Sequence, residues 1–178
     1  MSAVSTPLSG AYTADPVHSS FGFAVQYQGV SVFRGTLGDV EASLADGRLE
    51  GRAKVESISI RTPEQFRAHV LSEEFFDAAN HPEVRFVSDD VELNEDGTAK
   101  VTGDLTIKGI TNPVAAAGTW TAPAPDAFGN TRGHLRLEAV IDRTQWQMNW
   151  NLPLPSGGNV LANDVTLTVD VSLLEQQA

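Results

Sequence analysis

Apolar and polar residues alternate along almost the whole chain, and a single helical signal interrupts this pattern. Alternation with a period of two sends successive side chains to opposite faces of a β-sheet. The alternation is clearest from Val165 to Leu173, and it recurs at residues 20–27 and 100–108. Weaker alternation predicts five further strands, at residues 33–44, 47–60, 83–93, 113–122 and 131–142. The chain is therefore predicted to contain about eight strands.

Eight antiparallel strands leave two unpaired edges unless the sheet closes on itself. Turn signals at Asp46-Gly47 and Asp96-Gly97, together with the segment from Pro123 to Asn130, favour direct connections between sequential strands. We therefore predict an all-β fold, an antiparallel up-and-down, lipocalin-like β-barrel of about eight strands with one short helical excursion. A β-sandwich is the alternative architecture.

The predicted inner face of the barrel mixes large apolar residues with small ones, notably Gly103, Ala116 and Gly118. A small residue on a strand lets a ligand or a neighbouring backbone come close. Two interpretations follow from this pattern. The lumen holds a ligand, or the core is filled and its taper requires small side chains.

The helical excursion covers residues 62–77. Between Val55 and Ile58 the apolar phase slips by one residue, which predicts a β-bulge near Ser57 that turns the chain toward the helix. The run Thr-Pro-Glu-Gln that opens the excursion matches a capping box with proline at the first helical position. Ser72 followed by two glutamates is a second start signal, so we expect a short, broken helix that acts as a movable cover of the lumen. Its lumen-facing residues are predicted to be Phe66, His69, Val70, Phe75 and Phe76.

The ligand-binding residues predicted from the remaining segments share the apolar phase of their strands. In the segment that contains Trp146 and Trp150, alternation places both rings on one face if the chain is extended there. The predicted residues are Phe23, Val25, Tyr27, Val32, Phe86, Leu105, Ile107, Trp120, Trp146 and Trp150.

Composition limits the classes of function. A chain of 178 residues with 41% hydrophobic residues is long enough for one domain with its own core, which we place at residues 12–174 between flexible termini at 1–11 and 175–178. The absence of cysteine excludes disulfides and cysteine-ligated metals. A formal charge of -11 disfavours binding to nucleic acid and to anionic membranes. No stretch is apolar enough to span a bilayer, and no secretory signal is evident, so we expect a cytoplasmic location, or a periplasmic one if a signal has been removed.

No motif demands catalysis or metal binding. The four histidines lack the spacing of known zinc sites, and no nucleophile elbow surrounds Ser19 and Ser20. We therefore predict no catalytic residue, no metal ligand and no cofactor. The leading hypothesis is that the protein is a binding module for a long apolar ligand. An enzyme that uses Tyr27, His69 or Asp104 as acid or base is the second hypothesis, and a filled-core structural protein is the third. The sequence leaves both a monomer and a homodimer open.

Several motifs in order along the chain resemble one known family. They are Asp-Pro-Val-His-Ser at residues 15–19, His-Val-Leu-Ser-Glu-Glu-Phe-Phe-Asp at 69–77, Gly-Asp-Leu-Thr-Ile-Lys-Gly-Ile-Thr at 103–111, and Asp-Arg-Thr at 142–144. Together they resemble the YceI-like polyisoprenoid-binding family, and the resemblance covers nearly the whole chain.

The resemblance implies a lipocalin-like barrel whose lumen holds a long isoprenoid, often of the quinone type, without any cofactor chemistry. Two positions depart from the family pattern. Tyr27 stands where family members often have histidine, and Phe66-Arg67 stands where an Arg-Asp pair often precedes the helical histidine. These positions could contact a ligand head group. The resemblance together with the missing signal implies a cytoplasmic branch of the family.

Overall fold

The computed structural model describes residue 8 and residues 10–176. Within this part of the chain it contains ten β-strands, one α-helix and two short 3-10 helices. The strands are β1 (Ala11–Ala14), β2 (Ser20–Tyr27), β3 (Ser31–Leu37), β4 (Val40–Ala45), β5 (Arg48–Lys54), β6 (Glu83–Leu93), β7 (Thr98–Ile107), β8 (Ile110–Pro125), β9 (Thr131–Asp142) and β10 (Leu161–Glu175). The helices are η1 (Val55–Ser57), α1 (Glu64–Leu71) and η2 (Arg143–Trp146).

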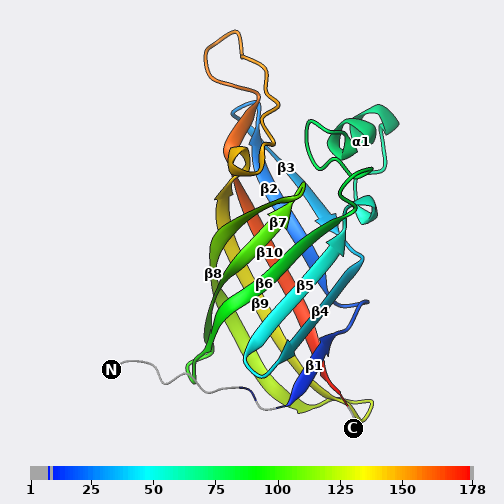
Figure 1. The fold of residues 1–178 in the computed structure, drawn as a ribbon, viewed down its shortest axis with the longest axis vertical. Helices are drawn as coiled ribbons and strands as arrows, with labels where there is room; N and C mark the ends of the chain where they lie inside the picture. The colour runs from blue at the N-terminus through cyan, green and yellow to red at the C-terminus, as the bar shows by residue number, and fades with distance from the viewer. Residues whose placement is uncertain (1–7, 9, 177–178) are drawn as a thin grey trace.

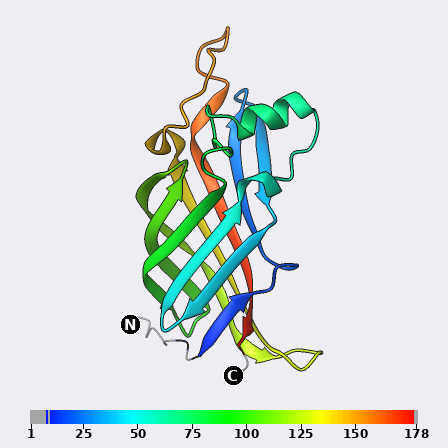
Figure 2. The same cartoon turned by 45° about the vertical axis from the view of Figure 1, so that its right-hand side comes forward.

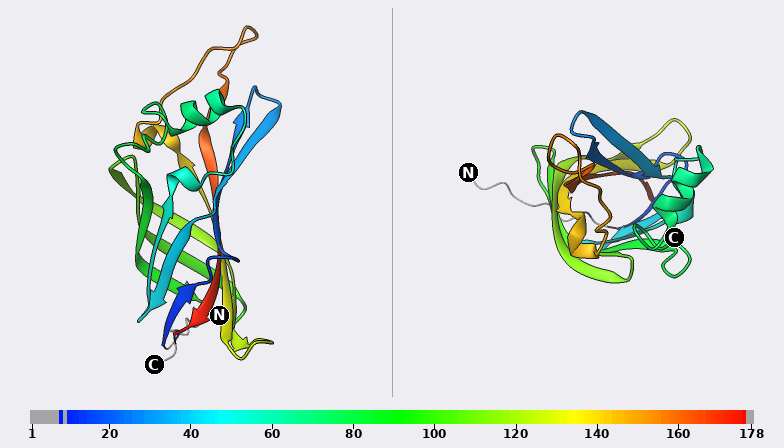
Figure 3. Two further views of the ribbon diagram at one scale, coloured as in Figure 1. Left: turned by 90° about the vertical axis from the view of Figure 1, so that its right-hand side faces the viewer. Right: turned by 90° about the horizontal axis from the view of Figure 1, so that it is seen from above.

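The sheet closes into a ring, which is visible from above (Figure 3). Each strand from β4 to β10 pairs antiparallel with the next, and β1 pairs with both β4 and β10 to complete a barrel of eight strands. The β2–β3 hairpin extends this ring beyond β1, because β2 continues the pairing along β10 (Figure 1). The predicted all-β, closed antiparallel barrel with one helix is confirmed.

Two of the predicted strands, at residues 33–44 and 47–60, differ in the structure. Residues 33–44 form the separate strands β3 and β4, with Gly38 and Asp39 between them. The β-bulge predicted near Ser57 is instead the 3-10 turn η1. The Ser57 hydroxyl donates to the Lys54 carbonyl and accepts from the Asp39 amide, so one side chain holds both breaks together.

Inward-facing residues form two stacked clusters along the barrel. The larger cluster fills the half that carries α1 and includes Leu37, Ile58 and Trp146. The smaller one fills the opposite half, around Val101 and Leu135. The face of β10 that alternation predicted to be buried is confirmed, because Val165, Leu167, Val171 and Leu173 are all buried.

The helix begins and is held differently from the prediction. Pro63 is the N-cap of α1 and makes no side-chain capping hydrogen bond, so the capping box expected at Thr62 does not form. Arg67 anchors the helix instead, donating to the carbonyls of Glu56, Ile58 and Ile60. The predicted break at Ser72 is confirmed, since Ser72 ends α1 and its hydroxyl donates to the His69 carbonyl. The second helix start predicted there is wrong, because residues 73–76 form a turn.

The first and last strands of the barrel extend closer to the chain termini than the sequence predicts. Ala11 and Glu175, which we expected in flexible termini, are the ends of β1 and β10. Gln176 adds a backbone hydrogen bond to the Ala11 carbonyl. Residues 1–7, 9 and 177–178 of the predicted termini lie outside the described residues.

A buried carboxylate holds the barrel together where the chain passes from β1 to β2. Asp15 is 8% exposed, and its carboxylate accepts hydrogen bonds from the Val17 amide and from Arg132 Nη1 and contacts His18 Nδ1 at 2.8 Å. These contacts, first His18 and then Arg132, hold the pKa of Asp15 well below its usual value. His18, which belongs to the Asp-Pro-Val-His-Ser motif, therefore has a structural partner at this seam.

We expect Asp15→Asn to lower the free energy of unfolding by about 2 kcal/mol at pH 7. A carboxyl with a depressed folded pKa stabilises the fold above its unfolded pKa of about 4, and this contribution disappears as the pH falls toward the folded pKa. The difference between the variant and the wild type should therefore shrink below about pH 4. Urea unfolding at several pH values measures it. Asp104→Asn, on the exposed side of β7, is the control and should change stability by less than about 0.5 kcal/mol. A difference for Asp15→Asn that stays constant down to low pH would contradict the assignment.

Candidate functional site: two cavities in the barrel lumen

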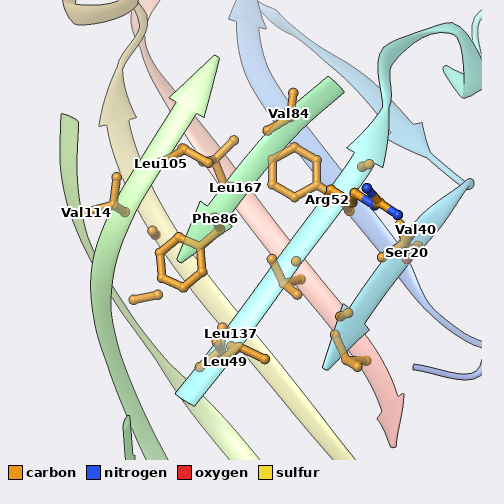
Figure 4. A pocket seen from close by; sticks show the side chains of 18 residues that line it. Ser20, Val40, Leu49, Arg52, Val84, Phe86, Leu105, Val114, Leu137 and Leu167 are labelled. Carbon is orange, nitrogen blue, oxygen red and sulfur yellow. The ribbon is translucent and has the colours of Figure 1, made fainter. Parts of the chain in front are cut away.

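Two apolar cavities lie one above the other inside the barrel. The lower cavity has a volume of about 90 Å³, and Figure 4 shows side chains such as Phe86, Leu105 and Leu137 converging on it from several strands. The upper cavity, beside α1, has a volume of about 270 Å³. Phe21 and Leu167 contribute to both walls, so the cavities adjoin each other.

Aromatic rings build much of the upper wall. Phe23 on β2 lies between Phe33 on β3 and Phe76 of the excursion, with ring centroids 5.7 and 6.0 Å apart. Phe66 on α1 meets the Phe33 ring edge-on at 5.4 Å. These contacts tie the excursion to the β2–β3 hairpin, and α1 lies beside that hairpin at one end of the barrel (Figure 2).

A second aromatic group joins the excursion to the loop that follows η2. The His69 ring packs against Trp150 at 4.8 Å and Phe75 at 5.1 Å. His69 Nε2 also lies 2.9 Å from Glu74 Oε2. Irregular segments therefore cover the upper end of the lumen. Side-chain contacts hold these segments together, and no continuous sheet joins them.

The structure places most of the predicted ligand-binding residues in the cavity walls, and their role in binding stays a prediction. Those in the upper wall are Phe23, Val25, Tyr27, Phe66, His69, Val70, Phe75, Phe76, Ile107 and Trp150. Phe86 and Leu105 line the lower cavity.

Three predicted residues lie outside both cavities, and the lumen-lining prediction is wrong for them. Val32 is 47% exposed on β3, because it pairs with the exposed Gln26 and lies on the opposite face of the hairpin from Phe33. Trp120 faces inward below the lower cavity, where its indole donates to the Asn94 carbonyl. Trp146 is 1% exposed and packed in the core, since η2 and the left-handed Gln147 break the extended segment that alternation suggested.

Several wall residues escaped the sequence analysis. Phe33 belongs to a strand whose alternation is weak, and Met148 and Leu161 lie beside an irregular loop. Arg143 also lines the upper cavity, although arginine is rarely a wall residue in an apolar site. Its only sequence signal was its place in the Asp-Arg-Thr motif.

Arg143 is the buried charge of the site. Arg143 is 4% exposed, and burial lowers the pKa of its guanidinium from the usual value. Nε donates to the Ala162 carbonyl at 2.9 Å, and Nη1 donates to the Met148 carbonyl. Nη2 is also buried and has no hydrogen-bond partner among the described residues.

The small residues on the inner face divide into two kinds. A Cβ on Gly103 would lie 2.6 Å from the Ser88 Cα, and one on Gly118 would overlap the Arg136 carbonyl. At these two positions a neighbouring backbone is what comes close. Ala116, in contrast, lines the lower cavity.

Within residue 8 and residues 10–176, no helix is long and apolar enough to cross a membrane. The same residues contain no group of three or more histidine, aspartate or glutamate side chains placed to hold a metal ion.

The model of the YceI-like domain matches residues 12–173, more than half of the chain. The chain belongs to the YceI-like family. A UPF0312 protein of Pseudomonas savastanoi pv. phaseolicola is 30% identical over 121 residues, which cover 65% of this chain and 63% of that relative. A UPF0312 protein of Pseudomonas fluorescens is 30% identical over 155 residues, or 80% of this chain and 77% of the relative. The alignment with the first relative thus spans less than two thirds of its length.

Solved structures share the YceI-like fold at low identity. BcnA of Burkholderia cenocepacia superposes with a TM-score of 0.66 at 17% identity, covering 92% of this chain and 99% of that one. A structure described as a polyisoprenoid binding domain from Saccharophagus degradans gives a TM-score of 0.65 at 11% identity, covering 93% and 98%. These likenesses show the fold.

Proposed function

We propose that this YceI-like protein binds one long apolar lipid, an isoprenoid or a chain of similar width, along the barrel axis as its carrier or reservoir. The observation that carries the proposal is the pair of adjoining apolar cavities. Protein interiors are normally packed with few voids larger than a water molecule. A void of about 270 Å³ above a second one is far more than a filled core leaves. The polyisoprenoid binding named for the Saccharophagus degradans domain supports the same class of ligand.

Burial of the chain supplies the affinity. Each buried methylene contributes about 0.8 kcal/mol, so ten of them contribute about 8 kcal/mol before association costs of roughly 4 kcal/mol or more. Apolar contact is non-directional, so chain length and width should govern affinity more than detailed chemistry.

The direct test is extraction of the purified protein with organic solvent, followed by mass spectrometry. A lipid in stoichiometric amount that is absent from an unrelated protein purified from the same cells is the expected result. A chemically altered lipid after incubation would favour the enzyme hypothesis. Protein that carries no lipid and takes up no polyprenol or long-chain alkane would contradict the proposal.

We expect Val165→Phe to reduce lipid binding while the barrel still folds. Val165 on β10 lines the upper cavity, so a larger ring there occupies space that the ligand needs. Displacing about three methylenes from contact costs about 2 kcal/mol, which weakens binding roughly thirtyfold. The matched control is Val140→Phe, which adds the same ring at a position on the neighbouring strand β9 that is 64% exposed. Titration with a fluorescent polyene lipid measures both, and equal affinities for the two variants would contradict binding in the upper cavity.

A further inference from the structure

Arg143 occupies an unusual position for an arginine whose role is only to join two segments. It follows the end of β9 and lines the upper cavity together with Met148 and Leu161. Its bonds to the Met148 and Ala162 carbonyls fix the loop after η2 against β10. Those two bonds use Nε and one N–H of Nη1, and they leave both N–H groups of Nη2 without an acceptor among the described residues.

The guanidinium of Arg143 also has no ion-pair contact in the part of the chain that the structure describes, although the neighbouring Asp142 carboxylate acts on it electrostatically. No carboxylate there forms an ion pair with the guanidinium. The adjacent Asp142 accepts hydrogen bonds from the amide and hydroxyl of Thr144. Guanidinium groups stay protonated in proteins, and buried charges are normally paired. The site therefore presents a buried cation without an ion-pair contact and a nitrogen, Nη2, whose N–H donors have no acceptor among the described residues.

We propose that Arg143 binds the carboxylate of a lipid acid whose apolar chain fills the lumen. The inference rests on the proposed lipid binding and deepens it by naming the head group. Arg143 follows the end of β9 in the half that holds the upper cavity. The acid group would therefore lie under the loop after η2, with the chain directed toward Phe21 and the lower cavity.

Charge and donor number favour a carboxylate over other oxygen groups. A carboxylate carries a single negative charge, which matches one guanidinium, and its oxygens accept from planar N–H donors. A phosphate monoester carries up to two charges, while the other wall residues of the upper cavity are apolar apart from Tyr27 and His69. A neutral alcohol or ketone would accept a hydrogen bond but leave the charge unpaired.

Three ligands with one branched carbon skeleton test the proposal on the wild-type protein: phytanic acid, phytanol and phytane. Displacement of a bound fluorescent polyene lipid measures their affinities after the protein has been stripped of lipid. We expect the acid to bind about tenfold or more tightly than the alcohol and the alkane, as a charge-assisted hydrogen bond provides. Equal affinities would overturn the role of Arg143 and leave lipid binding intact. Failure of the polyene lipid and of all three ligands to bind would overturn both proposals, whereas a bound polyene lipid that the acid does not displace would overturn only the role of Arg143.

Variants then locate the preference. Arg143→Gln keeps an amide donor but removes the charge, and it should bind all three ligands with nearly equal affinity. The matched control is Arg136→Met on β9, which removes a positive charge from an exposed ion pair with Asp170 on β10 and should keep the preference for the acid. If Arg143→Gln does not fold, Arg143→Lys serves the same purpose: a compact ammonium lacks the planar donors, so the preference should fall below that of the wild type. A preference that persists unchanged in the folded variants would overturn the proposal.

Discussion

Trp146→Ala is expected to lower the free energy of unfolding by about 4 kcal/mol, the largest effect we anticipate for a single substitution. Trp146 is 1% exposed and packs in the larger core cluster, so truncation leaves a cavity that its neighbours cannot fill. Its indole donates to the Leu105 carbonyl at 3.0 Å, and the variant also loses this buried hydrogen bond. Urea unfolding followed by circular dichroism measures the loss.

Two further substitutions separate packing from hydrogen bonding and from ligand contact. Trp146→Phe keeps most of the apolar volume but removes the donor, so about 1 to 2 kcal/mol should be lost. Trp150→Ala should cost less stability than Trp146→Ala, about 1 kcal/mol, because Trp150 is only half-buried in the cavity wall. It should weaken lipid binding instead. A larger stability loss for Trp150→Ala than for Trp146→Ala would contradict the structural assignment of the two rings.

Gly103→Ala is expected to destabilise the barrel by about 3 kcal/mol, although it adds only one methyl group. The new Cβ would lie 2.6 Å from the Ser88 Cα and 2.7 Å from the Phe86 ring. Ser88 borders the register shift between β6 and β7, so the backbone of β6 would have to move. Of the two interpretations that the sequence left open at Gly103, the close approach of a neighbouring strand is the one that the structure shows.

Gly51→Ala is the matched control. Gly51 lies on β5, lines the lower cavity, and has the Ala42 Cβ and the Glu41 carbonyl as its nearest neighbours, both at an ordinary 3.7 Å. The change should alter stability by less than about 0.5 kcal/mol. Denaturation midpoints of the two variants, measured side by side, decide the matter. Similar midpoints would mean that the β6 backbone yields at Gly103.

Much of the barrel could be predicted from the sequence, because each strand records which of its faces is buried. Alternation from Val165 to Leu173 placed the buried face of β10 correctly. No tertiary information was needed, because a strand with one face toward water and the other toward the core alternates polar and apolar side chains. The helix break at Ser72 was equally local, because one hydroxyl ends α1 by bonding within its own turn.

The position of an inward-facing residue along the barrel axis could not be predicted from the sequence. Alternation tells inside from outside but gives no depth, so Trp120, Trp146 and Trp150 looked equivalent in the sequence. One closes the lower end, one is core and one lines the upper cavity. What separates them is the distance to the opposite wall, which closure of the ring sets.

The irregular segments depended most on the tertiary structure. The predicted capping box at Thr62 does not form, and α1 is anchored instead by Arg67, whose acceptors lie in η1 and in the residues just after it. Arg143 has the same polar sequence signature as an exposed arginine, and only the packing of β10 and the loop after η2 around it makes it a buried charge. The sequence by itself determined the strands and their faces, since these follow from neighbours along the chain. The tertiary structure decided which inward-facing positions adjoin empty space and which polar group lies unpaired beside it, because both depend on surfaces that distant segments contribute.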